Sequence, residues 1–416
     1  MRIILSLIKR EGRKMDLPIK EIERAAERIA PSIHRTKLER SKTFSEMSGA
    51  EVYFKFENQQ KTGSFKIRGA SNKIAAMVER GEIKAAVASS AGNHAQGVAY
   101  AAHINNIPAT IVMPKNAPIA KVSATEGYGA DVVLSGDCYD DAYKKAVEIC
   151  ELEGASFLHP YDDLEVIAGQ GTIGFEVLKD LPTVDMIIVP AGGGGLLAGV
   201  AACVKQINPR VQIVGVQAEG ANAISQGFRA KNHITTDAVS TIADGIAVKC
   251  PGKITQDLIN KYADDVVTVS DAEISAAILL LLERSKQVVE PAGATTLAAV
   301  LNNKIDIAGK RVVCVLSGGN IDVSFIHRII EIGLMARERK IKFYTTLSDT
   351  PGSLEKLARI IGDNGANVVM VQYDRMNADL NPNEVIIHLA CEVGGKEHGN
   401  KVVKQLEKNG YRVIKE

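Results

Sequence analysis

The chain of 416 residues lacks an excess of charge of either sign, because 50 lysines and arginines stand against 49 aspartates and glutamates. A net charge of +1 gives no long-range field that would draw the protein to nucleic acid or to an anionic membrane. We therefore expect neither among its partners. Hydrophobic residues make up 46% and charged residues 24%, which is the ordinary mix of a globular protein with a large core.

Long apolar runs are also missing, since glycines or charges interrupt every stretch before the roughly 20 residues needed to cross a bilayer. The run Ile3–Ile8 is shorter than the roughly 7–15 residues of a secretory signal core, and no small-residue cleavage site follows it. Met15 precedes a regular amphipathic segment at 18–31. We interpret residues 1–14 as an N-terminal extension and leave Met1 and Met15 open as starts.

The cysteines include no C-x-x-C pair and no metal-ligand spacing. Most lie in apolar stretches, where a free thiol packs as a small hydrophobic group. We expect a reduced, cytoplasmic protein without a metal site. The six cysteines are Cys138, Cys150, Cys203, Cys250, Cys314 and Cys391.

Short β-rich runs alternate with helical stretches from about residue 50 to 320. The predicted strands are Val52–Phe56, Ala85–Ala88, Ala109–Val112, Val132–Leu134, Met186–Val189, Ile213–Val216 and Val312–Leu316. Helical stretches between them are Ala95–Ile104, Asp140–Glu153 and Leu197–Ile207. This alternation predicts an α/β fold with a buried, largely parallel open sheet, split across two lobes.

The pattern changes after residue 340. Residues 326–340 form a predicted linker helix, and residues 341–416 read as β-α-β-β-α-β, the ferredoxin-like order. Its elements are strand Ile341–Leu347, helix Ser353–Asn364, strand Asn367–Asp374, strand Glu384–Val393, helix Lys396–Asn409 and strand Tyr411–Ile414. The sequence thus predicts a separate C-terminal domain.

Lys66 lies between Phe65 and Ile67 at the start of a predicted helix. Partial burial lowers a lysine pKa because desolvation disfavours the ammonium, and a neutral amine can form a Schiff base. The alternative is an amphipathic helix from which the lysine reaches solvent. Taken alone, the segment favours that alternative.

Two strand ends carry anion-binding features. In the segment 89–97, small residues precede a predicted helix, whose first N–H groups could bind a carboxylate or phosphate. A helix cap with a structural His94 explains the same residues equally well. The glycines at 192–195 let the backbone wrap an anion. Gly193-x-Gly195-x-x-Ala198 also fits a loose dinucleotide fingerprint, but that leaves Lys66 and Asn93 unexplained.

A further strand end carries Leu316-Ser-Gly-Gly-Asn320, a turn at the position where open α/β sheets bind ligands. Together these motifs resemble those of the fold-type II pyridoxal-phosphate enzymes (tryptophan synthase β-like), and among them the threonine dehydratases. The matching segments are 64–70, 90–97, 192–196, Thr241–Ile246, Glu290–Ala294 and 317–320. The resemblance covers roughly residues 20–325, and the tail at 341–416 resembles an ACT domain through Leu-Ser-Asp-Thr-Pro-Gly-Ser-Leu at 347–354.

The resemblance implies a role for each matched residue. Lys66 would carry pyridoxal phosphate through an imine, Phe65 would pack on its ring, Asn93 would bind its ring hydroxyl, and Ser317 would meet its ring nitrogen. The cofactor phosphate would bind Gly192, Gly193, Gly194, Gly195 and Leu196. The substrate carboxylate would bind Ser90, Ala91, Gly92, Asn93 and His94. An amino-acid effector would bind Asp349, Pro351, Gly352 and Ser353 in the tail.

The implied reaction is β-elimination of the hydroxyl of L-threonine, giving 2-oxobutanoate and ammonia, with L-serine as a second substrate. The implied assembly is a homo-oligomer, dimer or tetramer, with a catalytic domain at 15–325 whose small lobe spans about 53–155. The sequence leaves open whether the enzyme serves isoleucine synthesis or threonine breakdown. It also leaves open whether the tail binds an effector or is only a packing module.

Three other functions fit parts of the sequence. Serine racemases carry a second serine where this chain has Ala91, so we expect poor racemisation, and Gln217 and Ala223 replace their acidic metal ligands. The context of Lys66 and the ACT-like tail argue against a β-replacement enzyme. The intact Lys66 argues against a non-catalytic amino-acid sensor.

Overall fold

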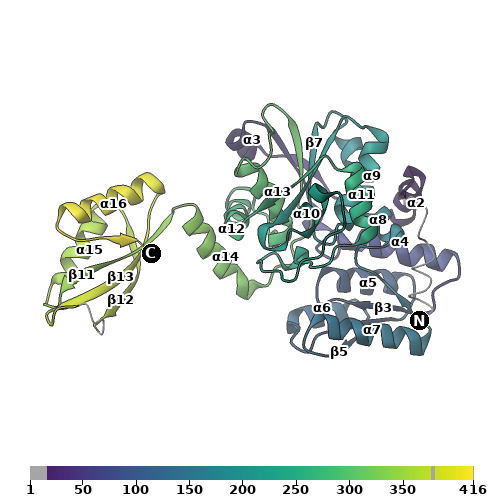
Figure 1. Cartoon of the computed structure of the whole chain (residues 1–416), viewed down its shortest axis with the longest axis horizontal. Helices are drawn as coiled ribbons and strands as arrows, with labels where there is room; N and C mark the ends of the chain where they lie inside the picture. The colour runs from purple at the N-terminus through teal and green to yellow at the C-terminus, as the bar shows by residue number, and fades with distance from the viewer. Residues whose placement is uncertain (1–15, 376–379, 416) are drawn as a thin grey trace. The chain divides into compact units, whose positions relative to one another are not determined.

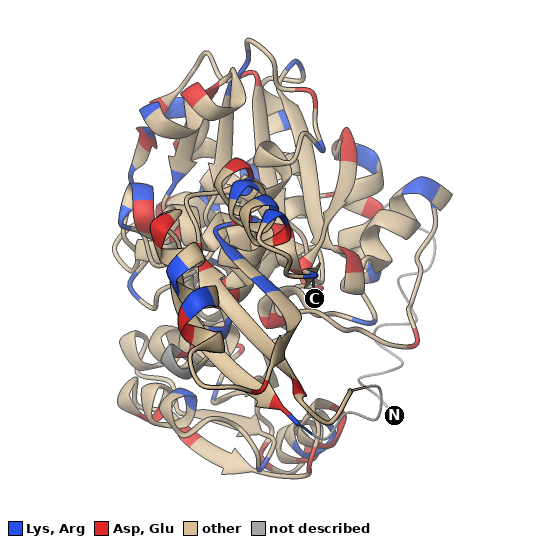
Figure 2. Cartoon of the chain, turned by 90° about the vertical axis from the view of Figure 1, so that its left-hand side faces the viewer, with Lys and Arg blue, Asp and Glu red and all other residues tan. Residues whose placement is uncertain are grey.

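The computed structural model describes residues 16–375 and 380–415, so the predicted extension at 1–14 lies outside the described residues. The chain divides into two compact units, Met1–Asp322 and Val323–Glu416 (Figure 1). Basic and acidic residues are interspersed along the described helices and strands (Figure 2), in keeping with the balanced charge of the sequence. No helix in the described part of the chain is long and apolar enough to cross a membrane.

The larger sheet of the first unit has six strands, of which only the edge strand β1 is antiparallel to its neighbour. Its strands are, in spatial order, β1 (Leu38–Arg40), β2 (Glu51–Lys55), β10 (Arg311–Val315), β7 (Met186–Pro190), β8 (Gln212–Ala218) and β9 (Asp265–Val269). The central strand β7 is buried along its whole length. Such apolar strands are typical of parallel sheets that helices cover on both faces.

The smaller sheet is parallel throughout and has four strands. They are, in spatial order, β5 (Asp131–Leu134), β4 (Ala109–Met113), β3 (Ala86–Ser89) and β6 (Ser156–Phe157). The two sheets agree with the predicted two-lobed arrangement. The small lobe was placed too early at residue 53, however, because β2 pairs in parallel with β10 of the larger sheet.

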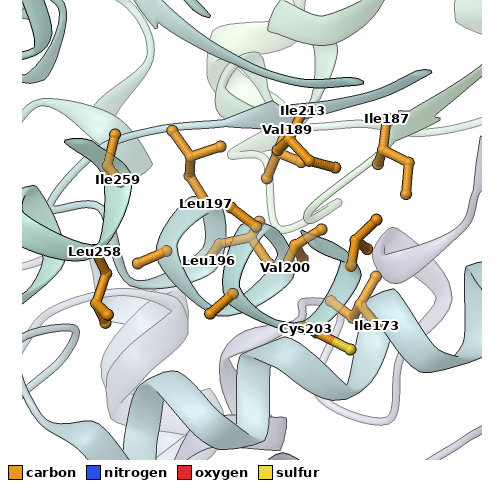
Figure 3. Close-up of a cluster of buried hydrophobic side chains, with 14 of the residues drawn as sticks. Ile173, Ile187, Val189, Leu196, Leu197, Val200, Cys203, Ile213, Leu258 and Ile259 are labelled. Carbon is orange, nitrogen blue, oxygen red and sulfur yellow. The ribbon is translucent and has the colours of Figure 1, made fainter. Parts of the chain in front are cut away.

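The helices of this unit pack on the sheets and on one another. They are α2 (Ile19–Ile29), α3 (Lys42–Ser48), α4 (Lys66–Glu79), α5 (Asn93–Ile104), α6 (Ile119–Gly127), α7 (Tyr139–Glu153), α8 (Leu164–Asp180), α9 (Gly195–Ile207), α10 (Ala223–Ala230), α11 (Lys253–Tyr262), α12 (Asp271–Leu280) and α13 (Pro291–Leu301). Helix α9 is at the centre of a core cluster, where Leu197 and Val200 lie near Val189 and Ile213 of the sheet (Figure 3). Each fully buried aliphatic side chain of this kind stabilises the fold by about 1.5–3 kcal/mol, so the start of α9 is held firmly.

The second unit begins with helix α14 (Val323–Ala336) and continues in the predicted order β-α-β-β-α-β. Its elements are β11 (Lys340–Ser348), α15 (Ser353–Asp363), β12 (Asn367–Asp374), β13 (Glu384–Glu392), α16 (Lys396–Lys408) and β14 (Ile414–Lys415). The strands form an antiparallel sheet in the order β12-β13-β11-β14. Leu357 and Ile361 of α15 and Leu406 of α16 pack on Phe343 and Ile387 of the sheet.

Candidate active site

A cavity of about 640 Å³ opens in the first unit, at the ends of β3, β7 and β10. Ligands of α/β proteins bind at such carboxyl ends of strands. All residues that the sequence assigned to cofactor or substrate line this cavity, although they come from four separate segments. They are Phe65, Lys66, Ser90, Ala91, Gly92, Asn93, His94, Gly192, Gly193, Gly194, Gly195, Leu196 and Ser317.

Lys66 is the first residue of α4, and the residues before it are tied to the loop after β10. The Phe65 N–H donates to the Ser317 carbonyl at 3.0 Å, and Ser64 forms an isolated bridge with Gly318. Burial lowers the pKa of Lys66 to about 8, while the negative charge of Glu290 opposes this shift. At pH 7 about one such amine in ten is neutral, against about one in several thousand for an ordinary lysine. The position therefore suits an amine that must react.

The start of α4 is also held from its opposite side by Arg68, whose side chain is fully buried. The five N–H groups of its guanidinium donate at 2.7–3.1 Å to Glu57, Glu176 and Thr172. Lys55 donates to Glu176 as well, so the cluster contains two cations and two anions. A guanidinium with all five donors satisfied fixes its neighbours in one geometry.

The glycine loop joins β7 to α9. A Cβ on Gly193 would lie 2.3 Å from the Tyr161 ring, and Gly194 has φ +98°, so both positions need glycine. The Gly193 carbonyl accepts from the Thr255 hydroxyl at 2.7 Å, which fixes the loop. Helix α9 starts at this loop, so its unpaired N–H groups and the positive end of its dipole face the cavity side of the loop. Together with the Lys66 amine in the same cavity, they fit a phosphate-bearing aldehyde.

The predicted substrate loop runs from Ser90 to the first turn of α5. Its Gly92 N–H donates to the Ser90 hydroxyl at 3.3 Å, and no side chain caps the helix, which leaves its first N–H groups for a ligand. His94 donates its Nε2–H to the Leu158 carbonyl at 2.9 Å. Burial lowers the pKa of His94 to about 3, so this imidazole is neutral at physiological pH. The ring thus has a structural bond as well as a place in the cavity wall.

Several cavity residues were not predicted as site residues. Glu290 accepts two hydrogen bonds from Asn93, and Lys121 of α6 pairs with Asp244 at 3.0 Å across the cavity edge. Glu290 and Asp244 lie in motifs that carried the resemblance, which was the available signal for them. Tyr161 packs on the glycine loop. Neither it nor Lys121 lies in a sequence motif that would have identified it as a site residue.

Among the residues that the structure describes, no group of three or more His, Cys, Asp or Glu side chains is placed to hold a metal ion. Gln217 is fully buried, and its amide oxygen accepts from the Ser225 N–H at 2.8 Å.

The residues assigned to an effector lie in the second unit, at the turn between β11 and α15. Asp349 makes a bidentate ion pair with Arg375 at 3.0 and 3.1 Å, and this bond lowers the pKa of the carboxyl. Gly352 has φ +89° and precedes Ser353, the first residue of the helix. Pro351 lies immediately before that glycine.

Comparison with known proteins extends these findings. The family model for pyridoxal-phosphate-dependent enzymes matches residues 29–318. An L-threonine ammonia-lyase of Thermotoga maritima is 47% identical over 397 residues, 95% of this chain and 99% of that protein. A catabolic L-threonine dehydratase of Escherichia coli K12 is 46% identical over 318 residues, 76% of this chain and 97% of that protein.

Solved structures give the same result. The processed form of threonine deaminase isoform 2 from Solanum lycopersicum has a TM-score of 0.72 and 35% identity, covering 77% of this chain and 90% of that chain. A maize serine racemase has a TM-score of 0.72 and 38% identity, covering 78% and 99%. The chain therefore belongs to the family of pyridoxal-phosphate-dependent enzymes, in the fold-type II group that contains the threonine dehydratases, and pyridoxal phosphate is its cofactor.

Proposed function

We propose that this enzyme is a threonine ammonia-lyase, which converts L-threonine to 2-oxobutanoate and ammonia. The observation that carries the proposal is the meeting of the Lys66 amine, the glycine loop and Ser317 in one cavity. The activity is that of the relatives named L-threonine ammonia-lyase, which match 95% of this chain at 45–47% identity.

The cofactor's place follows from the residues that line the cavity. The N–H groups from Gly192 to Leu196 would hold its phosphate, Lys66 would bond to its aldehyde carbon, and Phe65 would pack beside its ring. Ser317 would meet the ring nitrogen with a neutral hydroxyl, which would not stabilise a proton there and so would disfavour competing transamination. When bound, pyridoxal phosphate supplies an aldehyde for the substrate amine and a conjugated ring that withdraws electrons from Cα.

The chain's own residues then carry out the elimination. The N–H groups at the start of α5 orient the substrate carboxylate and so place the α-hydrogen toward Lys66. The Lys66 amine, when it is not bonded to the cofactor, would take the α-proton, because its lowered pKa leaves part of it neutral near pH 7. The β-hydroxyl would leave as water, and the α-proton that Lys66 has taken balances the proton that this water contains. The resulting enamine would add water and give the 2-oxo acid and ammonia.

L-Serine is the second substrate in this proposal, because it differs from threonine by one methyl group. A pocket discriminates such a group by only about 1–3 kcal/mol. Racemisation of serine is expected to be slow, since Ala91 in the substrate loop has no proton to deliver.

We also propose a role for each of three parts of the chain. Residues 15–325 are the catalytic domain, 326–340 the linker helix, and 341–416 an ACT domain that regulates the enzyme by binding an amino acid. The ferredoxin-like order of the second unit supports this assignment, as does the match of 95% of the chain to the Thermotoga ammonia-lyase. We further propose a cytoplasmic homo-oligomer.

The test is a substrate comparison with the purified protein and pyridoxal phosphate. L-Threonine and L-serine are supplied separately, and 2-oxobutanoate, pyruvate and ammonia are measured. Equal amounts of 2-oxobutanoate and ammonia from threonine support the proposal. Turnover of serine alone would move the assignment to a serine ammonia-lyase, and isoleucine or valine that leaves the rate unchanged at millimolar concentration would speak against regulation by these amino acids.

A further inference from the structure

Glu290 is a buried carboxyl group in the cavity wall that has no part in the proposed elimination. It immediately precedes Pro291, the first residue of α13, and its side chain is only 4% exposed. Its N–H donates to the Gly318 carbonyl at 3.0 Å, which ties it to the loop that carries Ser317. A buried carboxylate is costly unless it has hydrogen-bond or charge partners, so its partners indicate its role.

The first partner is Asn93, which lies 197 positions away in the sequence. Its Nδ2 is 2.9 Å from each Glu290 carboxylate oxygen, and its Oδ1 accepts from Asn320 Nδ2 at 2.8 Å. Turning the Asn93 carboxamide over would set its oxygen against the carboxylate and its NH₂ against that of Asn320. Glu290 and Asn320 therefore permit a single orientation of this side chain.

The backbone around the carboxylate is shaped to admit it. A Cβ on Gly318 would lie 2.4 Å from Glu290 Oε1, and one on Gly245 would lie 3.5 Å from the same atom. Gly318 therefore leaves space that the carboxylate fills. This fit shows that the carboxylate has a defined place and does not merely point into open solvent.

The second kind of partner is charge. Burial raises the pKa of Glu290 to about 7, and the negative charge of Asp244 adds to the rise. The hydrogen bond from Asn93 and the positive charges of Lys121 and Lys66 oppose it. Lys66 and Glu290 line the same cavity. Lys121 is itself paired with Asp244, and His94 of α5 is neutral at physiological pH. The Lys66 ammonium and the Glu290 carboxylate thus stabilise each other's charged forms.

We propose that Glu290 is a positioning residue, which holds the Asn93 carboxamide with its nitrogen turned toward the carboxylate and provides the counter-charge to the Lys66 ammonium. Through Asn93 it fixes the wall beside the cofactor ring. Through its charge it sets how readily Lys66 keeps the proton taken from a substrate. The inference depends on Lys66 being the cofactor lysine and not on the identity of the substrate.

The test measures the pKa of Lys66 in the full-length protein freed of cofactor, after circular dichroism has shown that each variant is folded. Acylation of amines is followed from pH 6 to 11, and the modified Lys66 peptide is quantified by mass spectrometry. Glu290→Gln should lower the apparent pKa of Lys66 by about one pH unit, since a nearby opposite charge shifts a pKa by about 1–3. At pH 7 the neutral fraction of Lys66 would then rise from about one in ten to about one in two, so the labelling rate should rise about fivefold.

Two further variants separate the role of charge from that of structure. Glu165→Gln removes a partly buried glutamate that pairs with Lys73 and Arg80 outside the cavity, and it should leave the pKa of Lys66 unchanged. Glu290→Asp keeps the negative charge, but its shorter side chain moves the carboxylate away from Asn93. Cofactor affinity should therefore fall about tenfold, while the pKa of Lys66 stays near 8. An unchanged Lys66 pKa in Glu290→Gln would overturn the counter-charge role, and full cofactor affinity in Glu290→Asp would overturn the positioning of Asn93. Neither measurement uses a substrate, so both hold if the enzyme acts on an amino acid other than threonine.

Discussion

Replacing Arg68 by methionine tests whether the buried ion cluster holds the helix that carries Lys66. Methionine keeps much of the side-chain volume but removes all five donated hydrogen bonds. Glu57, which is fully buried, then loses its bidentate partner, and Glu176 keeps its bond to Lys55. Breaking a buried ion pair in this way costs about 3–5 kcal/mol, because a charge is left without compensation.

The assay is thermal unfolding of the cofactor-free protein, followed by circular dichroism since the sequence contains no tryptophan. Leaving the cofactor out prevents its binding from masking the change in stability. For a unit of this size the cost corresponds to a fall in Tm on the order of 5–10 °C. Arg80→Met is the matched control, because Arg80 also pairs with two glutamates but is 42% exposed, where such pairs contribute about 0–1 kcal/mol. Equal Tm values for the two variants would refute the reasoning.

The remaining predictions concern the cavity. The rate of covalent cofactor attachment should rise about tenfold per pH unit up to about pH 8 and then level off, because only the neutral Lys66 amine reacts. Stopped-flow absorbance measures this rate, and a rise that continues to pH 10 would contradict the prediction. Gly193→Ala should weaken cofactor binding at least about tenfold in an absorbance titration, since its Cβ would strike Tyr161 and overpacking costs about 1–3 kcal/mol; wild-type affinity would disprove the fit. Lys121→Ala should change the KM for L-threonine by less than about fivefold, because its partner Asp244 is largely exposed, and a larger loss in initial-rate assays would show a direct role in binding.

The strands of the catalytic unit were predictable where apolar β-branched runs end in glycine or proline. β4, for example, was predicted at 109–112 and spans Ala109–Met113. β1 was missed because Leu-Glu-Arg has no apolar alternation, and its conformation comes from backbone pairing with β2. Helix α8 was also missed, since nearly all of its central residues are buried and no polar face marks its period.

The residues lining the cavity were predictable because they lie next to strand ends in short, recognisable segments. The contacts among them were not, since they join residues distant in the sequence. Arg68 reaches Glu176 over 108 positions, and Asn93 reaches Glu290 over 197. Nor does the sequence show that Tyr161 packs on the glycine loop, because that packing depends on the tertiary fold alone.

The most direct test of the account is turnover of L-threonine by the wild type and by Lys66→Ala, with borohydride reduction of the wild-type holoenzyme before peptide mapping. We predict 2-oxobutanoate from the wild type, none from the variant, and a reduced pyridoxyl group on the peptide that contains Lys66. Threonine turnover that survives in Lys66→Ala, or a pyridoxyl group on another lysine, would contradict the central claim.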